Sequence, residues 1–237
     1  MQRAPQSAVM AGLPRVRKGL RALTRSPPLG FVLVVLLLAG EASEACAHPH
    51  VWVIMQSTLL YAADGSILGV RHAWRFDDMF SAFALQGIPH KRKDAYTREE
   101  LAPLAEVNVT SLKEYGYFTQ AWADRKKVPL TKPIDYWLEY ADSALTLHFI
   151  LPVKNPIVAK RLLFEIYDPT WFVDFSYADK EPVVLLGAPA GCHVNVQRPA
   201  GFDVAKGQQL GEDFFNSLTA TSNFGAQFAN KVLVQCP

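Results

Sequence analysis

The chain has 237 residues, of which 50% are hydrophobic and 19% are charged, and it contains 14 Phe, 8 Tyr and 5 Trp. This composition supports a substantial buried core and excludes a disordered chain. The formal net charge is +2, but this value averages over two unlike parts of the sequence.

The first part has the features of a secretory signal. Positions 1–27 carry basic residues and no acidic ones, and an apolar run follows between Gly30 and Gly40. The run is shorter than the ~20 residues that a membrane-spanning helix needs, and a small-residue Ala-x-Ala pattern ends at Ala47. We therefore expect cleavage after Ala47 and a periplasmic location. An uncleaved N-terminal membrane anchor is the alternative.

Cleavage would reverse the sign of the charge. Removing residues 1–47 takes away six basic and two acidic side chains, and it leaves 190 residues with 18 basic and 20 acidic ones. The net charge of residues 48–237 would be −2, so nothing remains of an electrostatic argument for nucleic-acid binding.

Cys192 and Cys236 are the two cysteines of residues 48–237. An even pair in an exported protein predicts a disulfide. Neither cysteine lies in a C-x-x-C motif, which argues against the alternative of two metal-binding thiolates. Closing a span of 44 residues would stabilise the fold by roughly 4 kcal/mol in the chain-entropy model.

Most predicted elements are strands. The apolar runs Val51–Tyr61 and Ile67–Phe76 flank a turn signal at Asp64-Gly65, which predicts a hairpin. The second half of the chain alternates in the same way between apolar runs and turn signals. Further strands are predicted at Tyr117–Ala123, Lys126–Leu130, Tyr136–Tyr140, Ala144–Leu151, Leu162–Tyr167, Phe172–Tyr177, Pro182–Leu186, Cys192–Gln197 and Lys231–Cys236.

Between these strands the sequence predicts a helix pair over about 77–115. Apolar residues recur at a spacing of 3.6 after Asp77, and Thr97 with Glu100 has the form of a capping box that starts the second helix. We therefore expect an α+β fold. It would be a mostly antiparallel β-sheet or sandwich with an inserted EF-hand-like helix–loop–helix, and residues 48–237 would form a single β-rich domain.

Four blocks of sequence resemble a known family. They begin at His48, Trp74, Tyr167 and Gly187, and they read HPHVWV, WRFDDMFSAF, YDPTWFVDF and GAPAGC. In this order they are similar to the bacterial family called domain of unknown function 1007, described as the periplasmic component of an uncharacterised ABC-type transport system. The resemblance covers essentially all of residues 48–237. It implies a membrane transporter subunit as partner and a context of zinc, nickel or cobalt transport.

The loop between the two helices departs from that family. Its members often carry an EF-hand-like D-x-D-x-D-G loop there. If Glu100 is placed at position 12 of such a loop, Pro89, Lys91 and Lys93 occupy positions 1, 3 and 5, where a calcium site needs oxygen ligands. Two lysines would repel the ion. We therefore expect a helix–loop–helix scaffold and no calcium.

The N-terminus that cleavage would produce carries the strongest candidate site. His48 would offer its free amine and its imidazole to one metal ion, and His50 lies on the same side of an extended strand. Imidazole binds zinc, copper and nickel. Pro49 has no amide N–H, which excludes the square-planar chelate that uses this amide. The competing interpretation is that both histidines are polar residues at a frayed terminus.

Three further residues are candidate metal ligands. Asp168 and Asp174 lie in an aromatic-rich run, where buried acids need partners, and they could bind the metal directly or support its ligands. An ordinary turn at Asp168 and a hydrogen-bonded strand acid at Asp174 explain them equally well. His72 could also bind the metal, but a histidine on one strand face with Trp74 is more often a satisfied sheet histidine.

The sequence carries none of the common catalytic motifs, including G-x-S-x-G, H-E-x-x-H, a phosphate-binding loop or G-x-G-x-x-G. We therefore predict no catalytic residues, no bound organic cofactor and no enzyme. The first hypothesis is a periplasmic accessory protein that binds a divalent transition metal, zinc or nickel above all, and serves a membrane transport system. The alternatives are a metal-free protein–protein interaction module of the cell envelope, and a copper oxidative enzyme in which His72 or His148 completes a brace at His48.

Overall fold

The computed structural model describes residues 50–92, 95–199, 212–219 and 221–237. The predicted cleavage site at Ala47 and the candidate ligand His48 lie outside these residues. So does Lys93 of the predicted loop.

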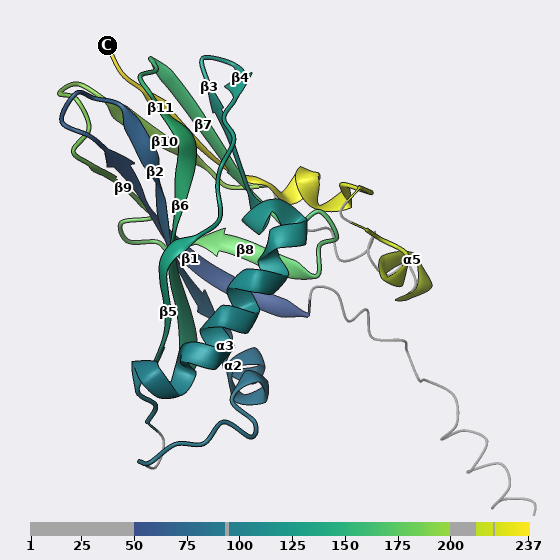
Figure 1. Cartoon of the computed structure of the whole chain (residues 1–237). Coiled ribbons are helices and arrows are strands. Elements are labelled where there is room, and N and C mark those ends of the chain that lie inside the picture. Colours follow the sequence, from purple (N-terminus) through teal and green to yellow (C-terminus); the bar gives the residue numbers. More distant parts are fainter. Residues whose placement is uncertain (1–49, 93–94, 200–211, 220) are drawn as a thin grey trace, which may run out of the picture. The chain divides into compact units, whose positions relative to one another are not determined.

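The first of two β-sheets has the strand order β5-β6-β2-β1-β8, and β9 is a further partner of β1 (Figure 1). Strand β1 pairs antiparallel with β2 but parallel with β8 and β9. The prediction of antiparallel pairing is therefore too simple at this edge. The strands span Val51–Tyr61 (β1), Ile67–Phe76 (β2), Ile134–Ala141 (β5), Ala144–Ile157 (β6), Val173–Tyr177 (β8) and Val183–Leu186 (β9).

The second sheet is antiparallel throughout and has the order β10-β11-β7-β3-β4. Its strand β4 covers two residues, shorter than the predicted Lys126–Leu130, because Pro129 cannot donate a ladder hydrogen bond. The strands span Thr119–Ala123 (β3), Lys126–Lys127 (β4), Arg161–Ile166 (β7), His193–Gln197 (β10) and Asn230–Gln235 (β11). The predicted α+β class with mostly β structure is confirmed.

Alternation along the strands decides which side chains form the core. In β1, Val53, Met55 and Leu59 are buried while Trp52 and Ile54 are exposed, as expected for a strand with one covered face. Side chains of the first sheet then meet those of the second. Leu59 and Val70 of β1 and β2 face Phe164 and Val232 of β7 and β11.

Two helices connect β2 to β3. Helix α2 spans Asp78–Ala84 and helix α3 spans Arg98–Ser111. The predicted capping box is confirmed: Thr97 Oγ1 accepts a hydrogen bond from the Glu100 N–H, and Glu100 Oε2 accepts one from the Thr97 N–H. Helix α3 ends earlier than predicted, and the segment η1 (Leu112–Phe118) continues it as a tighter 3₁₀ turn.

Helix α2 packs only part of its apolar spacing, Phe80 and Ala84, against the core. Its one buried residue is Ser81, whose hydroxyl donates to the Asp77 carbonyl oxygen and accepts from the Leu145 N–H. Met79 and Phe83 are 72% and 68% exposed. Two large apolar side chains of this helix therefore remain exposed.

The C-terminal part adds helix α5 (Glu212–Asn216), the 3₁₀ turn η2 (Phe224–Phe228) and strand β11. Trp171 stacks on Phe228 and lies near Phe215. The backbone of Gly225 approaches the Asp168 carbonyl oxygen so closely that a Cβ atom has no room there. This contact requires a glycine, and it fastens the chain before β11 to the loop before β8.

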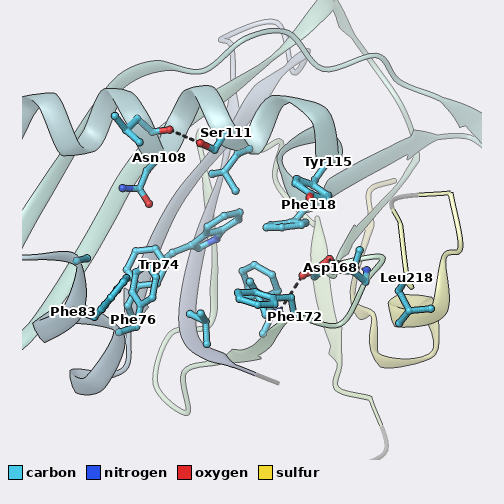
Figure 2. A pocket seen from close by; sticks show the side chains of 18 of the residues that line it. Trp74, Phe76, Phe83, Asn108, Ser111, Tyr115, Phe118, Asp168, Phe172 and Leu218 are labelled. Carbon is cyan, nitrogen blue, oxygen red and sulfur yellow. Dashed lines mark hydrogen bonds between the residues drawn. The ribbon is translucent and has the colours of Figure 1, made fainter. Parts of the chain in front are cut away.

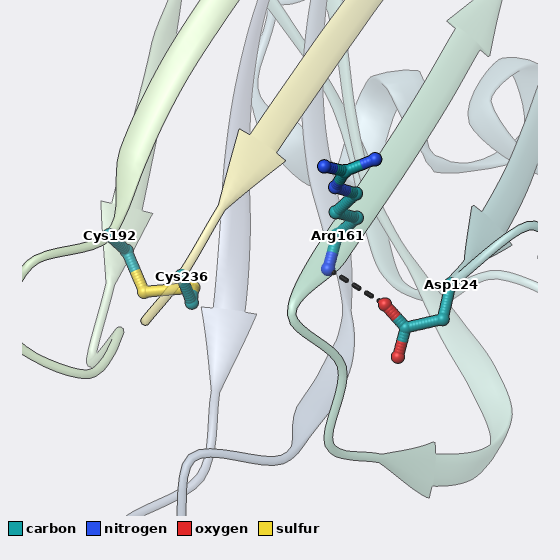
Figure 3. Close-up of a disulfide and its surroundings, with 4 residues drawn as sticks. All are labelled: Asp124, Arg161, Cys192 and Cys236. Atoms are coloured by element: carbon teal, nitrogen blue, oxygen red, sulfur yellow. Dashed lines mark hydrogen bonds between the residues drawn. A yellow bond between two sulfur atoms is a disulfide. The ribbon is translucent and has the colours of Figure 1, made fainter.

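The predicted disulfide between Cys192 and Cys236 forms (Figure 3). It joins the start of β10 to the end of β11 and closes a span of 44 residues. Beside it, the Asp124 carboxylate accepts a hydrogen bond from the Arg161 backbone N–H, which ties the β3–β4 turn to β7.

Candidate functional site: an apolar cavity

A cavity of about 750 Å³ lies between α2, α3, η1, α5 and the β1–β8 edge of the first sheet (Figure 2). This volume is within the range of known ligand sites, which are also mostly apolar. The sheet and the loop before β8 provide Val51, Trp74, Phe76, Asp168, Thr170, Phe172, Val173 and Phe175; the helical segments provide Phe80, Phe83, Ala84, Leu104, Val107, Asn108, Ser111, Leu112, Tyr115, Phe118, Phe215, Asn216 and Leu218.

A left-handed turn at the end of η1 shapes one wall. Gly116, Tyr117 and Phe118 have φ values of 60°, 56° and 50°, a conformation that costs non-glycine residues roughly 1–3 kcal/mol each. The turn reverses the chain between α3 and β3, so that Tyr115 and Phe118 both line the cavity. Their rings lie 5.3 Å apart.

Most polar side chains of the wall are already bonded within the protein. The Asn108 amide donates to the Leu104 carbonyl oxygen at 2.8 Å, and the Ser111 hydroxyl donates to that of Val107 at 2.9 Å. Trp74 differs from these residues. Its indole N–H is buried and has no hydrogen-bond partner among the described residues, and Figure 2 shows the ring in the middle of the lining. A buried donor left without a partner costs free energy.

The mouth of the cavity carries exposed apolar side chains. Phe83 is 68% exposed, Val107 is 61% exposed and Phe172 is 47% exposed, although all three also line the cavity. The apolar surface extends beyond the mouth to Met79 on α2. Exposed apolar side chains that lie together on the surface commonly mark an interaction site.

Asp168, one of the predicted metal ligands, lies in the cavity wall and is buried. One carboxylate oxygen accepts hydrogen bonds from the Thr170 N–H and hydroxyl, both at 2.8 Å, and the other accepts from the Val173 N–H at 3.0 Å. These bonds shape the turn that leads into β8. They match the turn interpretation of Asp168.

Asp174 and His50 lie on the outer face of the same sheet edge. Asp174 is paired with Trp52 across β1 and β8, and His50 is next to Val51 at the start of β1. The His50 ring lies 4.8 Å from that of Phe172. Burial raises the pKa of Asp174, and no other described residue forms a hydrogen bond or ion pair with its carboxylate.

His72 is fully buried on the inner face of β2, away from these residues. Its Nδ1 lies 3.0 Å from the Ser57 hydroxyl and its Nε2 lies 3.3 Å from the Thr119 hydroxyl. Burial lowers the pKa of His72 to about 3, so the ring is neutral near pH 7. Both nitrogens are thus occupied by hydroxyl groups, which is the arrangement of a satisfied sheet histidine.

The structure therefore places the predicted ligands at three different positions. Within the described ranges, no group of three or more His, Cys, Asp and Glu side chains is close enough to hold a metal ion. His148, the other histidine considered for a copper site, is half-buried; it stacks on Trp137 with ring centres 4.6 Å apart and contacts Glu139.

Sequence reasoning did not predict the cavity. The available signal was the set of apolar residues that recur at a spacing of 3.6 after Asp77, which we used only to predict a helix. Exposed apolar positions and buried ones give the same spacing, so periodicity alone does not separate an open groove from a core.

The fold and the cavity define a β-rich domain with an apolar cavity beside its first sheet. The chain belongs to the family described as Protein of unknown function (DUF1007), which matches residues 33–236. This confirms the resemblance found in the four sequence blocks. An uncharacterised protein of Haemophilus influenzae (strain ATCC 51907 / DSM 11121 / KW20 / Rd) is 23% identical over 194 residues, which cover 80% of this chain and 91% of the relative. No described helix is both long and apolar enough to cross a membrane.

Proposed function

We propose that this protein is a protein–protein interaction module that holds apolar side chains of a partner in the cavity. The observation that carries the proposal is the apolar cavity of about 750 Å³ whose mouth is formed by exposed Phe83, Val107 and Phe172. Burying bulky side chains in a preformed pocket is how a few residues supply most of the free energy of an interface.

The extent of the apolar surface favours a polypeptide over a small molecule. A small apolar ligand would be enclosed and would leave the mouth exposed to water. Met79 lies outside the lining and is 72% exposed, and a chain segment that crosses the mouth would cover it. Such a segment would place one or two anchor side chains inside and shield the rim, as interfaces with buried anchors do.

Selection from a random peptide library tests this proposal. We expect the selected peptides to share bulky apolar residues and to bind the wild-type protein in calorimetry. Val107→Asp, which places a charge at the mouth, should weaken binding at least about tenfold. Val158→Asp is the matched control, because Val158 is 68% exposed and lies outside the lining. Equal binding to both variants would contradict the proposal.

In this proposal the helix pair forms a wall of the cavity and does not bind calcium. An EF-hand-like origin of the pair is our interpretation. Two contacts support the structural role of its loop. Glu100 Oε1 accepts from the Lys91 N–H at 3.0 Å, and Oε2 accepts from the Thr97 N–H at 2.8 Å. Both oxygens of the acid that would close a calcium loop are thus engaged in holding the loop against α3.

Binding of zinc or nickel is the second candidate function, with service to a membrane transporter as its context. It is favoured by the position of His50 and Asp174 on one face of neighbouring strands. Calorimetry with zinc on protein that begins at His48 tests it. Affinity should fall in both His50→Ala and Asp174→Asn, and unchanged affinity in both would remove this site.

A further inference from the structure

We propose that the outer face of the first sheet binds a second copy of this chain, in a two-fold symmetric dimer in which Arg71 of each copy forms an ion pair with Asp174 of the other. This inference is independent of the cavity, which lies on the inner face of the sheet. It rests on the exposed apolar side chains of the outer face and on two charges that have no partner among the described residues.

Strand alternation places apolar side chains on this outer face. Trp52 and Ile54 of β1 are 45% and 53% exposed, and Val184 and Leu186 of β9 are 41% and 52% exposed. Strand β9 pairs with the second half of β1, so these residues follow one another along the same edge of the face. Exposed apolar side chains that lie together in this way commonly mark an interaction surface.

Two charged residues of this face lack a partner. Among the outward residues of β1, β2, β8 and β9, the charged ones are Arg71, Arg75 and Asp174. The Arg75 guanidinium donates to the Asp142 carbonyl oxygen at 3.2 Å. Within the described part of the chain, the side chains of Arg71 and Asp174 form no hydrogen bond or ion pair. Burial also raises the pKa of Asp174, which indicates that its charge is poorly hydrated.

These two charges are too far apart to pair within one chain. Arg71 is the cross-strand neighbour of Thr58 on β1, and Asp174 is that of Trp52. Six residues along β1 separate the two positions, which corresponds to about 20 Å of extended strand. An ion pair needs its N and O atoms within about 4 Å. Each chain therefore carries an unpaired cation and an unpaired anion at separate positions of one face.

A two-fold axis brings the opposite charges of two copies together. When two copies of one face meet about an axis that lies in the interface, a residue i of each copy contacts a residue j of the other. An axis midway between Arg71 and Asp174 thus forms both ion pairs at once. Strand β1 lies between β2 and β8, so this axis crosses β1 close to Ile54. The apolar Ile54 side chains of the two copies would lie at the centre of the interface, with an ion pair on either side.

Other occupants suit this face less well. A lipid surface would cover the apolar side chains but would leave both charges without a partner, which is costly. An unrelated protein would need an acid and a base at the matching distance, whereas a second copy necessarily carries them. Face-to-face packing of two sheets is also a common arrangement in folded proteins. The chemistry of the face therefore favours a second copy.

Charge-reversed variants test the contact. Sedimentation velocity is the readout, and a chelator is present so that a bound metal cannot join the copies. We expect the wild-type protein to dimerise in the micromolar range. Arg71→Glu and Asp174→Lys should each be monomeric there, because each substitution places like charges opposite each other in both contacts. An equimolar mixture of the two variants should dimerise again, since every contact in the mixed dimer joins opposite charges.

Lys126→Glu is the control for a change of net charge. Lys126 is exposed on β4 of the second sheet, so this substitution should leave the dimer intact. The inference fails if the wild-type protein is monomeric throughout the micromolar range, if the two charge-reversed variants dimerise as well as the wild type, or if their mixture stays monomeric.

A further pair of variants separates this face from the cavity. Ile54→Asp should weaken dimerisation by more than about tenfold, because it places a carboxylate without a partner at the centre of the interface. Val107→Asp, at the mouth of the cavity, should leave the dimer intact. The reverse pattern would assign the dimer to the cavity and overturn the inference. Unfolding of dilute, monomeric protein does not include these contacts, so the Asp174 carboxylate remains uncompensated there.

Discussion

The inner face of the first sheet is covered in two different ways. Where it meets the second sheet, side chains such as Leu59 and Phe164 pack against each other and the core is closed. Where it faces α3, the helix leaves a cavity of about 750 Å³ (Figure 2). Two residues of strand β2 illustrate the contrast: both nitrogens of His72 contact hydroxyls, whereas Trp74, two positions on, has a buried N–H with no partner among the described residues.

In the proposed function, this difference separates the part of the domain that maintains the fold from the part that binds the partner. Close packing makes substitutions in the closed part costly. A cavity with exposed apolar side chains contributes less to the stability of the fold than close packing does. Functional sites commonly give up stability in this way.

Substitution of two phenylalanines should give the largest difference in the free energy of unfolding between the closed core and the cavity. Phe149 is fully buried, and Phe83 is 68% exposed at the mouth. Phe149→Ala should lower the free energy of unfolding by about 3–5 kcal/mol because it leaves a cavity in a close-packed core. Phe83→Ala should change it by less than about 0.5 kcal/mol and should weaken peptide binding. Urea unfolding of both variants measures this, and similar losses in the two would show that the mouth is part of the core.

His72 gives the next largest effect, through pH. Its pKa is lowered from 6.5 to about 3 in the folded protein, so between these values the unfolded chain binds a proton that the folded protein excludes. Stability is therefore unaffected by this group above pH 6.5 and is lost as the pH falls below it, by roughly 2 kcal/mol between pH 7 and pH 5.

Urea unfolding at several pH values measures how steeply the free energy of unfolding falls as the pH is lowered. His72→Gln should flatten this slope, whatever its cost at pH 7. His148→Gln is the comparison, because burial also lowers the pKa of His148 but the side chain is half-buried and contacts Glu139. An unchanged slope in His72→Gln would show that another group titrates.

The closed part of the domain was the part that the sequence predicted best. Alternation in β1 and β2, the turn at Asp64-Gly65, the capping box at Thr97 and the disulfide are all local or compositional signals, and all are found in the structure. These features follow from physical chemistry within a few residues, or from the pairing of the two cysteines. Long-range contacts were not needed to predict them.

The cavity depends on contacts that no local pattern contains. The parallel pairing of β8 with β1, the left-handed turn at Tyr117 and the approach of Gly225 to Asp168 together decide where α3 and α5 leave space. The prediction of metal ligands was limited for the same reason, because long-range contacts decide what each side chain binds. His72 and Asp168 were chosen by residue type, and the fold engages both of them in internal hydrogen bonds.

The smallest expected effect concerns two carboxylates that looked alike in the sequence. Asp168 accepts three hydrogen bonds, whereas Asp174 has no hydrogen bond or ion pair with any described residue. Asp168→Asn should therefore lower the free energy of unfolding by roughly 1–2 kcal/mol. Asp174→Asn should raise it by about 0.5 kcal/mol at pH 7, a value reduced by partial exposure to water.

The sign of the Asp174 effect also has a pH dependence. Because burial raises its pKa, the folded protein binds a proton more readily than the unfolded chain, so the carboxylate destabilises the fold above the pKa values and this penalty disappears as the pH falls through them. Urea unfolding of Asp174→Asn should accordingly match the wild type at acidic pH and exceed it at pH 7. A variant that loses stability at pH 7 instead would make Asp174 a structural residue like Asp168.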